Sequence, residues 1–387
     1  MILEVTAVPY TTNHRGGGES FPWYLSEQLH FLEPTVFAYA QEDRPERVPS
    51  YHLVLPARFL DFPPFITRHN PLPTTETLRT ARSFLNEHLD ELDFIHVHNL
   101  RTAMSTMWLF LAHRLQPRSK FRILLTDHGS RWFPLPSLTV SWADAFLPVS
   151  SASRDQLLQF AQRPNWTLPV GVSPGYPGLH PPRNTNERRT IDVIFFGRLS
   201  AFKRPDLFLR LVSDLMKYGF PDLRAVLMGS PSGPHYWNYL QREIRRYDLG
   251  EKLRVVLNPS TKEAARILAD AKLNILLSNQ VPEGGSQRVA SELAPSTVLE
   301  AGSCGTPTLA STFRGVEDVI HPNETGIIVD TRRWSSVIGA ASRLLRDESQ
   351  WEALSNGVWQ FVRRERTYDH IARELQAFLN RLRQGGP

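Results

Sequence analysis

Residues 191–209, IDVIFFGRLSAFKRPDLFL, are the part of the sequence that decides the fold. They begin with a nearly unbroken apolar run, pass Gly197 and continue with apolar residues at the spacing of an amphipathic helix. Such a run predicts a strand that is buried on both faces, as in a parallel sheet covered by helices. A strand that leads directly into a helix is the repeating unit of these sheets. The stretch therefore predicts one strand and one helix of a parallel α/β sheet.

Short apolar runs alternate with helix-length segments on both sides of this stretch. Before residue 173 the predicted strands are ILEVTAVP, TVFAYA, HLVLPA, DFIHVH, RILLTDH and DAFLPVS, with a helix predicted over 75–89. After residue 190 they are IDVIFFG, LRAVLMG, LRVVLN, LNILLS, TPTLAS and TGIIVD, with helices predicted over 205–218, 234–247 and 261–270. We therefore expect an α/β fold with two Rossmann-like, doubly wound domains in tandem.

Length and one irregular stretch indicate where the domains meet. A chain of 387 residues is too long for one ordinary hydrophobic core, and two domains of roughly 150–190 residues are expected. The segment 173–190, SPGYPGLHPPRNTNERRT, is rich in Pro, Gly and Asn and is interpreted as a linker. This predicts an N-terminal domain over 1–172 and a C-terminal domain over 191–367.

Composition restricts the class of protein and of partner. With 41% hydrophobic and 21% charged residues, and no apolar run near the ~18 residues of a membrane span, the chain has the composition of a soluble globular protein. Cys304 is the only cysteine, and the start MILEVTAVP has the pattern of a strand rather than a signal peptide, so we expect a cytosolic protein. The net charge of +5 favours anionic partners. Because the basic residues are scattered, phosphate-bearing small molecules are favoured over nucleic acid, and a merely solvated basic surface is the alternative.

The residues that follow the predicted strands are the candidates for a site, because ligands of doubly wound sheets bind beyond the carboxyl ends of the strands. After the strand at 191–196, the connection to the next helix carries Arg198 and Lys203. Arg offers a planar fork and Lys a mobile point charge, so together they can clamp a diphosphate. The alternative is that both are solvated loop cations.

The stretch ELAPSTVLEAGSCGTP, residues 292–307, predicts a second anion site. Pro295 suits the first turn of a helix, and Ser296 or Thr297 can cap it. The free backbone N–H groups of Ser296, Thr297 and Val298, together with the helix dipole, can then bind an anion. We expect this helix start to face the cleft between the domains.

Two glutamates, Glu292 and Glu300, flank this helix start. Glu300 lies about one turn into the helix, within reach of ribose hydroxyls, whereas Glu292 precedes the helix and can contact another part of the same ligand. A glycosidase-like pair is the alternative, but its carboxylates flank a single bond. Here an anion site lies between them, which favours one extended nucleotide-sugar ligand. Gly302 is expected to permit close packing of the helix on the sheet.

Two features of the N-terminal half could belong to the same site. The segment 13–20, NHRGGGES, is a glycine loop whose backbone N–H groups could lie against phosphate. Its spacing is not that of a dinucleotide fingerprint or a P-loop, and a structural turn is the alternative. His128 ends the strand ILLTDH and could hydrogen-bond a sugar hydroxyl or a developing charge. Its alternative is a structural histidine at a strand end.

Metal binding is not expected. In HVH, residues 96–98, a strand would send both histidines to one face, but no third ligand is evident from the sequence. No Asp-x-Asp occurs anywhere in the chain, which removes the usual carboxylate pair of a metal–diphosphate complex. We therefore predict a site without metal.

The order of these motifs resembles that of the retaining GT-B glycosyltransferases of the glycogen synthase, sucrose synthase and mannosyltransferase type, family four in particular. A GG-x-E loop, a strand-end histidine, a GRL…K segment and a Glu-x7-Glu pair running into CGTP carry the resemblance, which spans nearly the whole chain. It implies two Rossmann-like domains facing across a cleft, with a C-terminal helix at 368–387 packing back on the N-terminal domain. It also implies roles near the diphosphate for Gly16, Gly17, Arg198 and Lys203, near the transferred sugar for His128 and Glu292, and at the ribose for Glu300.

The sequence departs from the family pattern at three places. The segment SNQVPEGGSQRVAS at 278–291 is inserted before the first glutamate, so Glu283 competes with Glu292 for the donor-sugar role. Glu292 is preferred because only it stands eight positions before Glu300. The turn PVGVSP, which includes Ser173, replaces an Asn-Gly-Val-Asp turn. The segment FPWY after the glycine loop is bulkier than expected, and it either shapes an acceptor pocket or belongs to the core.

The residues and the resemblance together predict transfer of a sugar from a nucleoside-diphosphate sugar to a hydroxyl acceptor, with retention and without a cofactor. Arg198, Lys203 and the helix start would stabilise the leaving diphosphate. Three alternatives stay open: a pseudo-glycosyltransferase that couples cyclitols, a sugar phosphorylase, and a non-catalytic nucleotide-sugar-binding module. A membrane-lipid acceptor is a further alternative, since RFLDFPPFITRH at 58–69 mixes apolar and basic residues, although its adjacent prolines favour an ordinary loop.

Overall fold

The protein is described as a computed structural model, and its described residues fall into two compact units. The structure describes residues 1–10, 21–22, 24–25, 28–29, 35–40, 52–56, 75–98, 103–128, 140–173, 175–176, 189–278, 281–282, 289–290 and 292–385. The first unit comprises Met1–Val170 together with Tyr368–Pro387, and the second comprises Gly171–Thr367.

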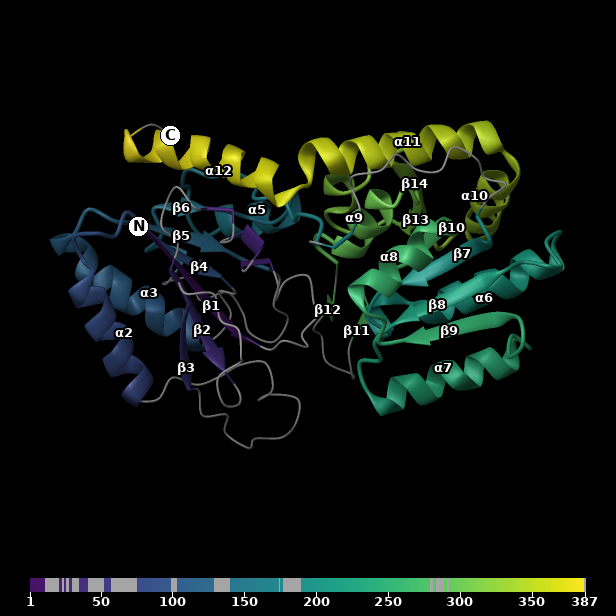
Figure 1. Cartoon of the computed structure of the whole chain (residues 1–387), viewed down its shortest axis with the longest axis horizontal. Coiled ribbons are helices and arrows are strands. Elements are labelled where there is room, and N and C mark those ends of the chain that lie inside the picture. The colour runs from purple at the N-terminus through teal and green to yellow at the C-terminus, as the bar shows by residue number, and fades with distance from the viewer. Residues whose placement is uncertain are drawn as a thin grey trace. The chain divides into compact units, whose positions relative to one another are not determined.

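A parallel sheet forms the centre of the first unit. Its strands are β1 (Ile2–Tyr10), β2 (Thr35–Ala40), β3 (His52–Pro56), β4 (Phe94–His98), β5 (Arg122–Thr126) and β6 (Ala145–Phe146). Their order in the sheet is β3-β2-β1-β4-β5-β6, and every adjacent pair is parallel (Figure 1). This is the Rossmann order, in which the direction of winding reverses between β1 and β4.

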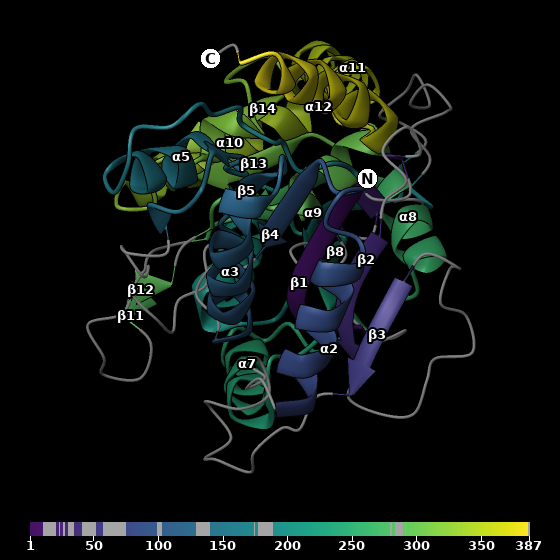
Figure 2. The ribbon, with the colours of Figure 1, turned by 90° about the vertical axis from the view of Figure 1, so that its left-hand side faces the viewer.

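The helices of the first unit are α2 (Thr75–Glu87), α3 (Ala103–Leu115), the 3-10 turn η2 (Gln116–Arg118), α5 (Ser151–Leu158) and α12 (Tyr368–Arg383). Helices α2 and α3 lie side by side, and α3 packs on the face of the sheet formed by β1, β4 and β5 (Figure 2). Trp108 of α3 is fully buried in the core on this side. The side chains of α12 also pack within this unit, where Phe378 stacks on Trp166.

The side chains of β1 and β4 divide between two faces because successive residues of a strand point in opposite directions. Leu3, Ile95 and Val97 belong to the apolar core under α2 and α3. Glu4 and the two histidines of the HVH segment alternate with them and do not belong to that core. Polar groups therefore gather on the opposite face, at the point where the strand order reverses.

A second parallel sheet forms the centre of the second unit. Its strands are β7 (Ile191–Phe196), β8 (Ala225–Gly229), β9 (Leu253–Leu257), β10 (Ala271–Leu276), β13 (Thr308–Ser311) and β14 (Gly326–Val329). Their order is β14-β13-β10-β7-β8-β9, which again is the Rossmann order when the strands are counted from β7. The short strands β11 (Val281–Pro282) and β12 (Val289–Ala290) form a separate antiparallel pair.

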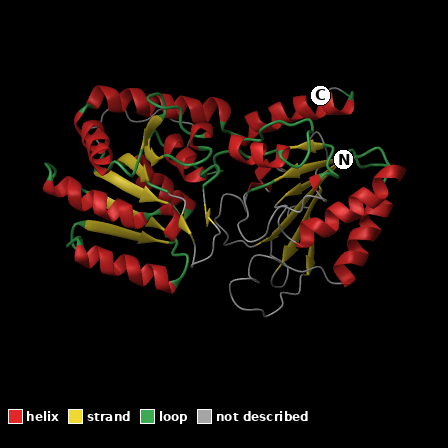
Figure 3. Ribbon diagram, turned by 180° about the vertical axis from the view of Figure 1, so that it is seen from behind, coloured by secondary structure: helices red, strands yellow, loops and turns green. Residues whose placement is uncertain are grey.

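Helices cover both faces of this second sheet (Figure 3). They are the 3-10 turn η4 (Ala201–Lys203), α6 (Pro205–Lys217), α7 (Pro234–Arg246), α8 (Thr261–Ala269), α9 (Ser296–Ser303), the 3-10 turn η5 (Val316–Asp318), α10 (Trp334–Arg346) and α11 (Glu348–Glu365). On β7, Val193 and Phe195 pack with α6 and α10, whereas Ile194 and Phe196 pack with α8 and α9. The apolar run at 191–196 is thus buried on both faces, as the sequence predicted.

The predicted fold class, two doubly wound parallel α/β units, is confirmed. One packing expectation is corrected: a side chain at Gly302 would lie 2.5 Å from Val358 of α11, so this glycine permits close contact of two helices rather than of helix and sheet. Within the described ranges, none of the helices is both long enough and apolar enough to cross a membrane.

Candidate functional site

Two glycines at the carboxyl ends of β7 and β8 bring the first site groups together. A Cβ on Gly197 would lie 3.2 Å from Cδ of Lys203 and 3.7 Å from Cγ2 of Thr297. A Cβ on Gly229 would lie only 1.7 Å from the carbonyl oxygen of Gly197, so the two strand ends can approach this closely only because Gly229 lacks a side chain. The lysine and the start of α9 therefore meet over the end of β7.

Lys203 is a buried cation that already has an anionic partner. Its side chain is 11% exposed, and its Nζ forms an ion pair with Oε1 of Glu292, whose side chain is 8% exposed. From the sequence, the two residues were expected at different parts of a ligand, whereas in the structure they are in direct contact. A ligand that binds to Lys203 is therefore also close to Glu292.

Arg198 and Arg204, on the same connection, differ in their contacts. Arg204 is held by Asp206 through several guanidinium hydrogen bonds, the shortest being 2.7 Å, and this pairing raises the pKa of the arginine. Arg198 is exposed, and no described residue forms an ion pair or hydrogen bond with its guanidinium. Among the described residues, Arg198 is therefore the cation of this connection that has no partner.

The start of α9 differs in detail from the prediction. Pro295 is the N-cap, with φ −70°, and no side chain caps the helix, so neither Ser296 nor Thr297 has the predicted capping role. The backbone N–H of Val298 donates to the carbonyl oxygen of Pro295 at 3.2 Å, and the Val298 side chain is fully buried. Of the three N–H groups that the sequence predicted for an anion site, Val298 is therefore engaged, and those of Ser296 and Thr297 donate to no described residue.

Three buried polar atoms on the connection after β7, at the start of α9 and just before it lack a hydrogen-bond partner among the described residues. They are Oγ of Ser200, Oγ1 of Thr297 and Oε1 of Glu292, although the last is paired with a charge. A buried polar atom without a partner costs about 1–3 kcal/mol. A polar ligand that supplied the missing partners would recover part of this free energy.

Glu300 is a buried carboxyl group on the first turns of α9. It is 7% exposed, and its Oε1 accepts a hydrogen bond of 3.0 Å from the hydroxyl of Ser173. Burial raises the pKa of Glu300 to about 7, and the hydrogen bonds from Ser173 and Ser296 and the charge of Lys203 only partly oppose this rise. In the sequence, Ser173 stood out only as a departure from a family pattern. In the structure it contacts Glu300, the residue that the sequence predicted to bind the ribose.

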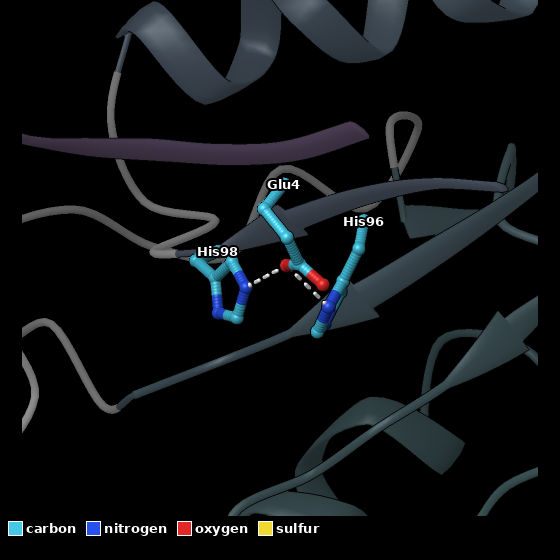
Figure 4. A group of neighbouring side chains, drawn as sticks. All are labelled: Glu4, His96 and His98. Atoms are coloured by element: carbon cyan, nitrogen blue, oxygen red, sulfur yellow. Dashed lines mark hydrogen bonds and ion pairs between the residues drawn. The ribbon is translucent and has the colours of Figure 1, made fainter. Parts of the chain in front are cut away.

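In the first unit, His128 belongs to a group of polar side chains with Glu4, His96 and His98. Glu4 was not among the candidates from the sequence. Nε2 of His128 lies 3.1 Å from Nδ1 of His98, and Nε2 of His98 lies 2.6 Å from Oε2 of Glu4. The same carboxylate oxygen lies 2.8 Å from Nδ1 of His96 (Figure 4). Glu4, His96 and His98 are fully buried, and burial lowers the pKa of the His128 ring well below its ordinary value.

The sequence showed no third ligand for the two histidines of HVH, and the structure supplies a candidate in Glu4. Glu4, His96 and His98 offer three atoms within 4.8 Å of one another, a spacing at which they could hold a metal ion. The signal that could have revealed Glu4 is an acidic residue inside the apolar run of the first strand. It was missed because the pairing of Glu4 with His96 depends on the register of β1 against β4.

Phe21 of the FPWY segment belongs to the core. It is fully buried, and its ring lies 5.3 Å from that of His128 and 5.8 Å from that of Tyr368. Gly16, Gly17 and Glu283 lie outside the described residues, as does most of the insertion at 278–291. The contest between Glu283 and Glu292 therefore stays a prediction.

Comparison with protein families finds two models that divide the chain between them. One is described as "Glycosyl transferases group 1" and matches residues 180–358. The other, "Glycosyltransferase Family 4", matches residues 15–176. A similar curated protein is the D-inositol 3-phosphate glycosyltransferase of Mycobacteroides abscessus, which is 30% identical over 152 residues. That match covers 38% of this chain and 31% of the length of the relative.

Solved structures with the same fold match along the whole chain. The sucrose-phosphate synthase of Thermosynechococcus elongatus has a TM-score of 0.74 and 17% identity, and the match covers 100% of this chain and 99% of the other. The HepE protein of Anabaena in complex with UDP-glucose has a TM-score of 0.68 and 14% identity, with coverage of 98% and 99%. At these identities the likeness is one of fold.

Proposed function

Because the chain belongs to the GT-B glycosyltransferases of the family-four type, we propose that it transfers a hexose from a nucleoside-diphosphate sugar to a hydroxyl acceptor. The observation that carries this proposal is the arrangement in the second unit. The connection after β7 carries the exposed Arg198 and the buried Lys203. The start of α9 presents the N–H groups of Ser296 and Thr297, which donate to no described residue. The buried carboxyl group of Glu300 follows one helical turn later.

Each part of such a donor has a matching group in the second unit. The diphosphate would bind to Arg198, Lys203 and the N–H groups at the start of α9, since cations and helix N-termini attract phosphate. The two ribose hydroxyls would donate to the carboxylate of Glu300. The sugar would lie next to Glu292, whose ion pair with Lys203 keeps it beside the diphosphate groups.

We propose that the diphosphate needs no metal ion as it leaves. Two cations and a helix dipole supply positive charge where negative charge develops in the transition state. We further propose transfer with retention, by analogy with the family, and assign no side chain of the chain as nucleophile. HepE was solved in complex with UDP-glucose, and we propose a UDP-hexose as the first donor to test.

Calorimetric titration with UDP, GDP, ADP and dTDP, first in EDTA and then with Mg²⁺, tests the donor site. We expect one diphosphate to bind with the same affinity in both conditions. Arg198→Ala should weaken that binding at least tenfold, because a hydrogen bond to a charged group contributes about 1.5–3 kcal/mol. Arg254→Ala, at an exposed position on β9, is the matched control and should bind as the unchanged protein does.

Failure of all four diphosphates to bind would contradict a donor site of this kind. Where one binds, incubation of its sugar conjugate with candidate acceptors and analysis of the product anomer test transfer and retention. Product analysis also distinguishes sugar transfer from the coupling of cyclitols.

A further inference from the structure

We propose that Glu4, His96 and His98 bind a divalent transition-metal ion, with Zn²⁺ as the ion to test first, and that this ion ties β1 to β4. Two imidazoles and one carboxylate are ligands that zinc takes in proteins. All three residues belong to the first unit, whereas the groups assigned to the donor belong to the second. The inference therefore does not depend on the proposed function.

The register of β1 against β4 places the three side chains on one face of the sheet. Glu4 is paired directly with His96, and His98 follows two residues later, so all three side chains point the same way. The carboxylate lies between the two rings (Figure 4). Its Oε2 lies 2.6 Å from Nε2 of His98 and 2.8 Å from Nδ1 of His96. Three potential ligand atoms thus converge on one point.

The hydrogen bonds of Thr126 determine which nitrogen of His96 carries a proton. Its hydroxyl lies 2.7 Å from the carbonyl oxygen of Leu147, and because a carbonyl can only accept, Thr126 donates its one proton there. Nε2 of His96 lies 2.7 Å from the same hydroxyl oxygen and must therefore donate to it. In a neutral ring, Nδ1 then carries a lone pair. This lone pair and the carboxylate oxygen of Glu4 are two acceptors only 2.8 Å apart.

Two buried atoms of this group have no hydrogen-bond partner among the described residues. They are Nδ1 of His96 and Oε1 of Glu4, and both residues are fully buried. In the described part of the chain, the ion pairs of Glu4 are with the two histidines, and no Lys or Arg neutralises it. Buried charges in proteins are paired or coordinate a metal ion. A cation between the carboxylate and the rings would neutralise Glu4 and would accept the lone pair of His96.

The second nitrogen of each ring already has the kind of partner that a metal ligand needs. A histidine that binds a metal ion is oriented by a hydrogen bond from its other ring nitrogen. Nε2 of His96 has the hydroxyl of Thr126, and Nδ1 of His98 lies 3.1 Å from Nε2 of His128. The nitrogens directed at Glu4 are therefore the ones left for the ion.

The spacing of the ligand atoms fits a metal ion after a small adjustment. Zinc lies about 2.0–2.2 Å from nitrogen and oxygen ligands, so two ligands of a tetrahedral ion are about 3.3 Å apart. The contacts of 2.6 Å and 2.8 Å would have to widen by roughly half an ångström. Oε1 of Glu4, which has no partner among the described residues, can serve as a fourth ligand. Because all three residues are fully buried, the ion would hold the structure rather than meet a substrate.

A proton is the rival occupant of the position between Glu4 and His96. A proton on Nδ1 would turn His96 into an imidazolium ion and would also neutralise the carboxylate. The two occupants differ in the metal content of the protein, which can be measured directly.

Elemental analysis of the full chain, expressed with zinc in the medium and purified without a histidine tag, tests the proposal. We expect about one zinc ion per chain, because a buried ion exchanges with the buffer only when the protein opens. Expression with Co²⁺ in place of zinc should give the visible absorption of a four-coordinate Co²⁺ ion. If the unchanged protein holds no transition metal in stoichiometric amount, the proposal is overturned and a proton occupies the position.

Glu4→Gln and His98→Asn each remove one ligand and keep a polar side chain. We expect the metal content of each variant to fall at least tenfold. The matched control is His113→Asn, at an exposed position in the last turn of α3, which should keep about one ion per chain. Metal that stays in both ligand variants, or that is lost equally from His113→Asn, would refute the assignment of the ligands.

Urea unfolding gives a second measurement, which does not require the variants to fold well. The unchanged protein is refolded from urea in the presence of either zinc or EDTA and is then titrated with urea. We expect a higher midpoint with zinc, because an ion that binds the folded state stabilises it. In Glu4→Gln the two midpoints should coincide. Equal midpoints in the unchanged protein would contradict an ion that ties β1 to β4.

Discussion

Replacing Glu300 by glutamine should change how the stability of the protein depends on pH. Burial raises the pKa of this carboxyl group from 4.5 to about 7. Between these values the folded state binds more protons than the unfolded state, so the group's contribution to stability is present below pH 4.5 and is lost as the pH rises through 7. The side chain is only 7% exposed, so little of this effect is screened by solvent.

The size of the effect follows from the same two pKa values. At 1.36 kcal/mol for each pKa unit, ionising the buried group costs about 3 kcal/mol, of which about 2.5 kcal/mol falls between pH 5 and pH 8. Glutamine cannot ionise and keeps nearly the same shape. Relative to the unchanged protein, Glu300→Gln should therefore gain about 2.5 kcal/mol of stability when the pH is raised from 5 to 8.

Urea unfolding at pH 5 and pH 8 measures this difference from the change in midpoint at constant slope. Glu251→Gln, at an exposed position, is the matched control and should show no dependence of its effect on pH. A stability difference between Glu300→Gln and the unchanged protein that is the same at both pH values would refute the reasoning. In calorimetry, the same variant should lose nucleoside-diphosphate binding if the ionised carboxylate holds the ribose.

Two further predictions concern the same unit. Lys203→Met should destabilise the protein by about 3 kcal/mol, because it leaves the carboxylate of Glu292 buried without its cation, and adding Glu292→Gln should recover part of the loss in a double-mutant cycle of urea unfolding. Additive losses would show that the ion pair is not formed in solution. Gly302→Leu should lower the free energy of unfolding by about 1–3 kcal/mol, because a Cβ there already approaches Val358 to 2.5 Å. The control is Gly339→Leu on α10, where a Cβ meets nothing within 4 Å. Equal thermal midpoints for these two variants would contradict close packing of α9 on α11.

Much of the second unit could be predicted from local sequence. The run IDVIFF is apolar at nearly every position, and only a strand covered on both faces buries it fully, so β7 and the parallel sheet followed directly. Arg198 and Lys203 were identified as candidates because the ends of parallel strands are where ligands bind. These inferences need only the order of residues along one strand and one turn.

Contacts between distant residues could not be predicted in this way. Glu4 and His98 are 94 residues apart, and they meet because β1 and β4 are neighbours in a register that no local pattern specifies. The pairing of Lys203 with Glu292 depends likewise on how the connection after β7 approaches the segment before α9. Even the capping of α9 was predicted wrongly, because Pro295 itself takes the N-cap position and its carbonyl engages Val298.

The sequence by itself determined the strands, the helices, the parallel character of the sheets and the residue types available at their ends, because hydrophobic periodicity and turn chemistry act over a few residues. The tertiary structure decided which of those side chains touch, which are buried and which keep a free polar atom. These properties depend on strand register and helix packing, and they set the pKa of Glu300.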